Sequence, residues 1–174
     1  YLNSLDLNEE DIKELLSFNT ITSLSYYKSY DIKGIDTELK LISNLKNLKE
    51  LILQGFEIDR SDITEEGIKL ISQLTNLEKL CDFEDRVVSL KPLENLKKLK
   101  EFTMYNVNII KEFPSNIPSL NYLNIHDMIL TQEQFNAITS LTNLNELSLN
   151  GRNIESKMKE IPESIFTLSK LTNL

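Results

Sequence analysis

The sequence predicts an α/β solenoid, in which short parallel strands stack in chain order and are joined by helices or extended segments. The first observation is a spacing of apolar residues that occurs twice between residues 120 and 154. The two sets, each separated by three, two and five residues, are Leu120, Leu123, Ile125 and Leu130, then Leu144, Leu147, Leu149 and Ile154. The second observation is that this pattern recurs along the whole chain, which makes chance a poor explanation.

The repeating unit has eleven positions, with apolar residues at positions one, four, six and eleven. Positions four and six share one face of a short strand, and position eleven turns the chain back toward the same core. One unit cannot cover its own leucine face, so neighbouring units must stack. The first positions, which lie 19, 27, 29, 22, 21, 24 and 30 residues apart, are Leu2, Ile21, Leu48, Leu77, Leu99, Leu120, Leu144 and Leu174.

Each unit is expected to contribute one strand, and two of these strands depart from the pattern. Tyr26 and Asp82 occupy position six, which should be buried and apolar. A local bulge would bring Phe83 inward in place of Asp82.

Helices are expected where apolar residues recur at helical spacing between the strands, over residues 9–18, 36–45, 62–74 and 131–141. Acidic residues open the first helix, and Asp36 is placed to cap the second. Asp62 and Glu65 have the spacing of a capping box in the third helix, which Gly67 weakens. The fourth helix has the same capping-box spacing at Thr131 and Gln134. Short or extended connections are expected instead near the prolines at positions 92, 114 and 118.

The period and the apolar pattern resemble those of leucine-rich repeat proteins over essentially the whole chain. The resemblance implies a curved solenoid with parallel strands on a concave face and mixed short helices and extended returns on a convex face. The family's asparagine ladder at position nine is missing, so packing at Phe56, Val107 and Met128 is expected to hold the turns. The return that contains Ile161 and Pro162 is similar to the plant-type pattern. We expect one domain over residues 1–174 with about seven repeats, as a fragment of a longer protein.

The composition favours a protein partner. The chain has 174 residues, 40% of them hydrophobic, and a net charge of −8. This charge argues against nucleic acid or an anionic membrane as the main partner, because both favour basic patches. The single cysteine, Cys81, excludes an internal disulfide, and no glycosylation site or signal peptide occurs in these residues. Together these features favour a reducing, cytoplasmic compartment. We expect a monomer once the end repeats are capped, because exposed apolar ends promote self-association.

Side chains at repeat positions three, five and seven are expected to form columns on the concave face. Aromatic residues surrounded by polar groups are typical of protein hot spots. The same rings could instead simply cover neighbouring strands, since aromatic residues are common in sheets. The predicted partner-binding site consists of Tyr27, Phe83, Tyr105, Tyr122, Asn124, His126 and Asp127.

No catalytic or cofactor chemistry is predicted. His126 and Asp127 are adjacent, but successive strand residues point to opposite faces, so the two are not expected to pair. One histidine and one cysteine do not make a zinc site, and no loop has a calcium motif or a glycine-rich phosphate cradle.

We therefore expect a non-catalytic protein-interaction scaffold that binds its partner on the concave face, without cofactor or metal. Two alternatives remain open. The chain could be the sensing or targeting segment of a larger enzyme, such as a ubiquitin ligase, kinase or cyclase, as the family resemblance allows. It could also be an extracellular receptor for peptide or carbohydrate.

Overall fold

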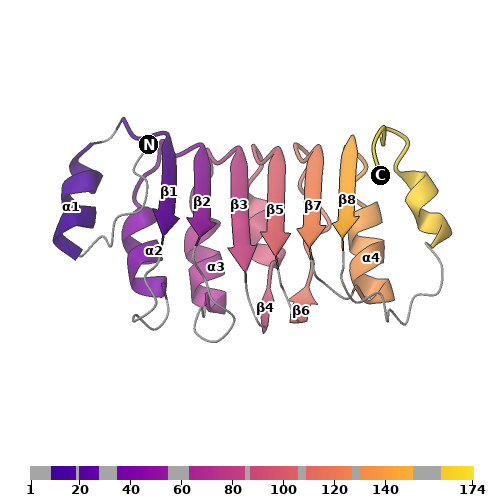
Figure 1. Ribbon diagram of the computed structural model, residues 1–174, viewed down its shortest axis with the longest axis horizontal. Coiled ribbons are helices and arrows are strands. Elements are labelled where there is room, and N and C mark those ends of the chain that lie inside the picture. The colour runs from indigo at the N-terminus through magenta and orange to yellow at the C-terminus, as the bar shows by residue number, and fades with distance from the viewer. Residues whose placement is uncertain are drawn as a thin grey trace.

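The computed structural model describes residues 9–18, 20–27, 35–54, 63–84, 87–105, 109–126, 130–150 and 162–174. Six parallel strands form one sheet in chain order. They are β1 (Ser23–Tyr27), β2 (Glu50–Gln54), β3 (Lys79–Glu84), β5 (Glu101–Tyr105), β7 (Tyr122–His126) and β8 (Glu146–Asn150). Figure 1 shows them side by side with their arrowheads pointing the same way. This arrangement confirms the predicted α/β solenoid. The strand expected near residue 2 lies outside the described residues.

Helices and short extended segments connect the strands (Figure 1). The α-helices are α1 (Glu9–Ser17), α2 (Asp36–Ile42), α3 (Glu65–Ile71) and α4 (Gln132–Thr139), and the 3₁₀ helices are η1 (Lys91–Asn95) and η2 (Glu163–Thr167). All four predicted α-helices are therefore confirmed, although their bounds are shorter than expected. Pro92 lies in the first turn of η1, where the sequence predicted a short turn in place of an α-helix.

The helix caps agree with the sequence at only one of the three proposed positions. Thr131 and Gln134 form the predicted capping box of α4. Asp36, however, is the first residue of α2 rather than its cap, and its carboxylate accepts hydrogen bonds from the hydroxyl and backbone N–H of Thr64. Thr64 in turn caps α3, so the prediction that Asp62 caps this helix was wrong.

The core is a stack of side chains from repeat positions one, four and six. In the third unit these are Leu48, Leu51 and Leu53, all with 0% of their surface exposed. Burying each leucine contributes roughly 1.5–3 kcal/mol, which explains why the coils stack. Tyr26 is also buried, so its ring takes the place of an aliphatic side chain. Leu149 in β8 is partly exposed. Among the described residues, only an isolated bridge pairs with the outer side of this strand, so little of the chain covers Leu149 there.

The backbone of β3 has the irregularity that the sequence predicted. The pairing between β3 and β5 shifts between Leu80 and Phe83, so that Phe83 stands opposite Met104 and Glu84 opposite Tyr105. Phe83 thus takes repeat position six in place of Asp82, as expected of the bulge. The side chains of Asp82 and Phe83 lie outside what the structure describes.

The last unit begins three residues earlier than the sequence predicted. Asn173 forms a bridge with Glu146, which occupies position three of the preceding unit. Leu171 is therefore at position one and Leu174 at position four. The corrected distance from Leu144 to Leu171 is 27 residues, in place of 30.

A second, two-stranded parallel sheet lies outside the main sheet and was not predicted. It consists of β4 (Val87–Ser89) and β6 (Ile109–Glu112). The Gln134 side-chain amide donates a 2.6 Å hydrogen bond to the Ile110 carbonyl and accepts one of 2.9 Å from the backbone of Thr131. This buried amide therefore joins the start of α4 to β6.

Candidate partner-binding face

The main sheet has one face toward the core and one face that we call the open face, formed by repeat positions three, five and seven. Strand pairing places equal positions opposite one another, so side chains from separate repeats form columns. The column at position seven brings Tyr105, His126 and Asn150 onto adjacent strands, and the column at position five does the same for Thr103, Asn124 and Ser148.

Tyr105 and His126 form a stacked pair on this face. Their ring centroids lie 4.7 Å apart, and the two planes differ by 11°. Both side chains are half-buried, so each ring covers its neighbour and still presents part of its surface to solvent. Parallel pairing of β5 with β7 fixes this geometry, because Tyr105 and His126 stand directly opposite one another.

Tyr122 and Asn124 form a second pair on β7. The Asn124 amide donates a 3.2 Å hydrogen bond to the Tyr122 hydroxyl. The Asn124 Oδ1 atom is buried and has no hydrogen-bond partner among the described residues. Thr103, which stands opposite Asn124 on β5, is only 8% exposed although it belongs to the open face. The middle of this face is therefore closely packed and contains one buried acceptor that is not satisfied.

Ion pairs join the first strands at repeat position three. Lys79 Nζ on β3 lies 3.5 Å from a carboxylate oxygen of Glu50 and 3.4 Å from one of Glu101. Partial burial is the largest single influence on the pKa of Lys79 and lowers it. The Cys81 sulfur and the two carboxylates act in the opposite direction, and together they raise the pKa above 10.5. These charges thus hold adjacent repeats together.

A second row of charges lies at repeat position two. Glu78 stands between two lysines, with carboxylate oxygens 2.6 Å from Lys100 Nζ and 3.5 Å from Lys49 Nζ. The hydrogen bond and charge of Lys100, followed by the charge of Lys49, lower the pKa of Glu78 below 4.5. Within each of these three repeats the residues at positions two and three carry opposite charges. The charge therefore alternates both along each strand and from one strand to the next.

The structure brings four of the seven predicted site residues together: Tyr105, Tyr122, Asn124 and His126 on β5 and β7. Tyr27 and Phe83 belong to β1 and β3, but the positions of their side chains lie outside the described residues, as does Asp127 altogether. The Tyr27 backbone is three strands from Tyr105, or about 14 Å at the usual strand spacing. A pairing of His126 with Asp127 is thus not tested.

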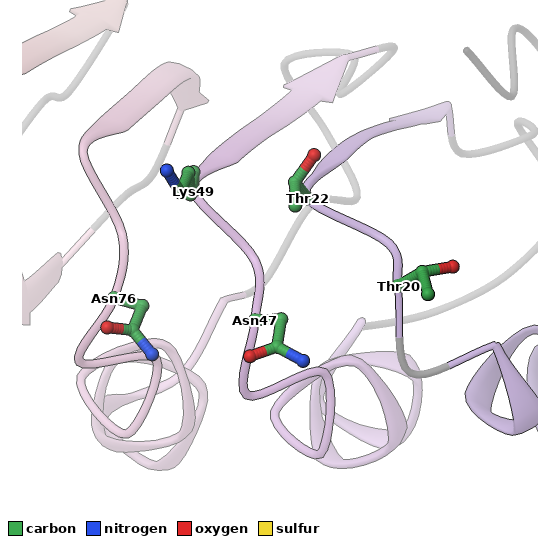
Figure 2. Close-up of a pocket in the computed structure, with 5 residues that line it drawn as sticks. All are labelled: Thr20, Thr22, Asn47, Lys49 and Asn76. Carbon is green, nitrogen blue, oxygen red and sulfur yellow. The ribbon is translucent and has the colours of Figure 1, made fainter.

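An open hollow of about 540 Å³, which was not predicted, lies where the chain enters the first strands. Figure 2 shows its polar lining, which comes from three successive repeats: Thr20, Thr22, Asn47, Lys49 and Asn76. The Asn76 amide donates a 2.8 Å hydrogen bond to the Lys46 carbonyl of the preceding repeat. Asn143 makes the same kind of bond to the Pro118 carbonyl. Asparagines just before position one thus bridge neighbouring coils.

Within the described ranges, no group of three or more His, Cys, Asp or Glu side chains could hold a metal ion. None of the helices in that part of the chain is long and apolar enough to cross a membrane.

No protein-family model matches this sequence, and no curated protein matches it either. Solved structures do match. An internalin from Listeria monocytogenes strain 4b F2365 superimposes with a TM-score of 0.61 and 21% identity, over 94% of this chain and 50% of that one. Internalin C2 from the same strain gives a TM-score of 0.57 and 18% identity, over 97% of this chain and 74% of that one. This chain thus spans half the length of the first internalin. Its parallel sheet and its likeness to these structures show that it has the leucine-rich repeat fold.

Proposed function

We propose that this chain is a non-catalytic protein-binding module whose contact surface is the open face around β5 and β7. The fold supports this role in general, because repeat solenoids present extended, preformed surfaces to their partners. A preformed surface lowers the ordering cost of binding.

The stacked Tyr105–His126 pair is the observation that favours this part of the face. Aromatic side chains that are rigid and partly exposed are the commonest binding hot spots. The neighbouring Tyr122 is also half-buried, and its hydroxyl gives a partner a polar group to recognise. Asn124 supports the same site, because its amide donates to the Tyr122 hydroxyl and so helps to hold that ring in place.

The test is affinity capture from an extract of the source cells, followed by quantitative binding to each captured protein. The wild-type chain is compared with a triple variant in which Tyr105, Tyr122 and His126 are replaced by alanine. The matched control is Phe166→Ala, because Phe166 is an aromatic residue on η2 that is 83% exposed. Circular dichroism establishes that both variants are folded.

If Tyr105 or Tyr122 is a hot spot, its single alanine variant should weaken binding by more than about 1 kcal/mol, or roughly fivefold. The Phe166 variant should bind as the wild type does. Equal binding by the triple variant would contradict the proposed site while leaving a binding role elsewhere on the chain. If no protein binds the wild type, the module hypothesis itself is wrong.

A further inference from the structure

Lysine side chains gather along one edge of the sheet, in a protein whose net charge is −8. We call this the entrance edge, because it is formed by the segments that lead into β2, β3 and β5. Its lysines, all exposed, are Lys46, Lys49, Lys97, Lys98 and Lys100. The acidic residues of the same segments are fewer, so the edge is locally basic.

Among the described residues, three of these lysines make contacts only with neutral oxygen atoms. Lys46 Nζ donates to the Ser43 carbonyl at 2.5 Å, and Lys98 Nζ donates to the Asn76 side chain at 2.6 Å. Lys97 Nζ donates to the Asn116 carbonyl at 3.4 Å. These bonds hold the ammonium groups in place without neutralising their charge, which leaves them available to an anion.

The remaining charges of the edge balance only in part. Glu78 is shared between Lys49 and Lys100, so that one carboxylate serves two ammonium groups. Glu94, on the neighbouring η1, instead accepts hydrogen bonds from the backbone and hydroxyl of Ser115. The lowered pKa of Glu78 agrees with a positive local environment.

The hollow of Figure 2 lies at this edge and is part of the same surface. Lys49 lines it directly, and Asn76 links it to Lys98 through the 2.6 Å hydrogen bond. The hydroxyls of Thr20 and Thr22 and the amides of Asn47 and Asn76 surround the hollow with hydrogen-bonding groups. The surface therefore combines cationic groups with polar groups that can bind a carboxylate or a peptide backbone.

We propose that the entrance edge binds an acidic segment of a protein, with carboxylates against Lys46, Lys97 and Lys98 and chain atoms in the hollow. The size of the basic area favours a short acidic segment over a longer polyanion. The strands β2, β3 and β5 are separated by two interstrand spacings, so the basic area is about 10 Å wide. A few carboxylates of a short segment can fit within this width. A long nucleic acid or an anionic membrane would extend beyond this area and meet the net negative charge of the rest of the chain. This proposal does not depend on the open-face site.

The test uses a fluorescein-labelled octaglutamate peptide and measures its fluorescence anisotropy with the full chain. The test variant carries Lys46→Gln, Lys97→Gln and Lys98→Gln, since glutamine keeps a donor but removes the charge. The matched control carries Lys40→Gln, Lys69→Gln and Lys91→Gln, three exposed lysines on or beside the helices. Both variants lower the net charge by the same amount, and circular dichroism establishes that each is folded.

The wild type should bind the peptide at about 0.02 M salt and lose affinity at about 0.3 M, because screening weakens exposed ion pairs. The test variant should bind on the order of tenfold more weakly, and the control variant nearly as well as the wild type. No binding by the wild type, or equal losses in both variants, would overturn the proposal. So would tighter binding of single-stranded oligothymidylate or of phosphatidylserine vesicles than of the peptide.

Discussion

Replacing Gly67 by alanine tests how closely α3 packs against α2. A Cβ atom at this position would stand 2.8 Å from Ile63 Cγ2 and 3.0 Å from Leu39 Cδ1, both on side chains that are 1% exposed. It would also come too close to the Asp36 carboxylate, which accepts the hydrogen bonds from Thr64. From the sequence alone, Gly67 was expected only to weaken the helix. The structure shows that a larger side chain at this position would collide with its neighbours, which explains why glycine occurs there.

Two effects of known size oppose each other in this variant. Alanine improves helix propensity by about 1 kcal/mol over glycine. Overpacking of a closed core costs about 1–3 kcal/mol, and displacement of the Asp36 carboxylate weakens its hydrogen bonds by about another 1 kcal/mol. We expect Gly67→Ala to lower the free energy of unfolding by about 1–3 kcal/mol, or a melting temperature lower by about 5 °C.

Urea unfolding followed by circular dichroism measures this change. The same substitution in an Asp36→Ala background is the control, because that background lacks the atom nearest to the new methyl group. Gly67→Ala should cost less there than in the wild type. If Gly67→Ala in the otherwise wild-type chain raised the free energy of unfolding by about 1 kcal/mol, the gain in helix propensity would outweigh any overpacking. That result would contradict the close approach of α2 and α3.

Three further changes follow from single contacts. Glu78→Gln removes a carboxylate whose pKa is lower in the folded protein than its ordinary value of 4.5. The ionised carboxylate therefore stabilises the fold at a pH above 4.5, and this contribution is lost as the pH falls through the lowered pKa. The melting temperature of the wild type should therefore fall more than that of the variant between about pH 6 and pH 3, and equal losses would refute this. Gln134→Leu leaves a buried carbonyl and a backbone N–H without partners, so urea unfolding should show a loss of about 2–4 kcal/mol, against about 0.5 kcal/mol for the exposed control Gln132→Leu. Asn124→Ala gives up one neutral hydrogen bond of about 1 kcal/mol. It also removes a buried acceptor that has no partner among the described residues and that destabilises the wild type by about 1–3 kcal/mol. We expect its stability to equal or exceed that of the wild type, and a loss above about 2 kcal/mol would show that Oδ1 is satisfied.

The strands and helices were predictable because their signals are local. Leu51 and Leu53 lie two residues apart and therefore define a strand face, and Thr131 and Gln134 are close enough in the chain to identify a helix start. The column that contains Tyr105 and His126 was predictable from the repeat itself, because the register of the repeats places equal positions opposite one another. The stacking of the two rings was not predicted. Whether that column binds a partner stays a prediction.

Contacts between repeats were harder to foresee. In the last unit Leu168, Leu171 and Leu174 are evenly spaced by three, so leucine spacing alone cannot set the register. The bridge between Asn173 and Glu146 sets it, together with backbone hydrogen bonds between Asn173 and its neighbours in the preceding repeat. The hollow at the entrance edge was missed because its lining comes from separate repeats and lies just before the strands.

The sheet of β4 and β6 was missed because its strands are short and its partners are 22 residues apart, as Val87 and Ile109 are. Nothing in either segment alone distinguishes a paired strand from an unpaired extended return. Pairing here depends on the stacking of two whole repeats, which is a property of the coil and not of the local sequence.

The pairing of β4 with β6 also leads to an expectation about how the solenoid bends. Parallel strands lie about 4.8 Å apart, whereas packed helices lie about 8–10 Å apart. Repeats with a helix in the outer layer are therefore wider on that side, and this difference in width curves the solenoid. Where β4 and β6 back the coils of β3 and β5, both layers consist of paired parallel strands, so the spacing of the outer layer should be close to that of the inner one. We therefore expect the solenoid to bend less at its centre than on the side of α2 and α3. A partner bound around Tyr105, as we propose, would then meet a nearly flat surface, which favours a flat or extended partner over a strongly convex one.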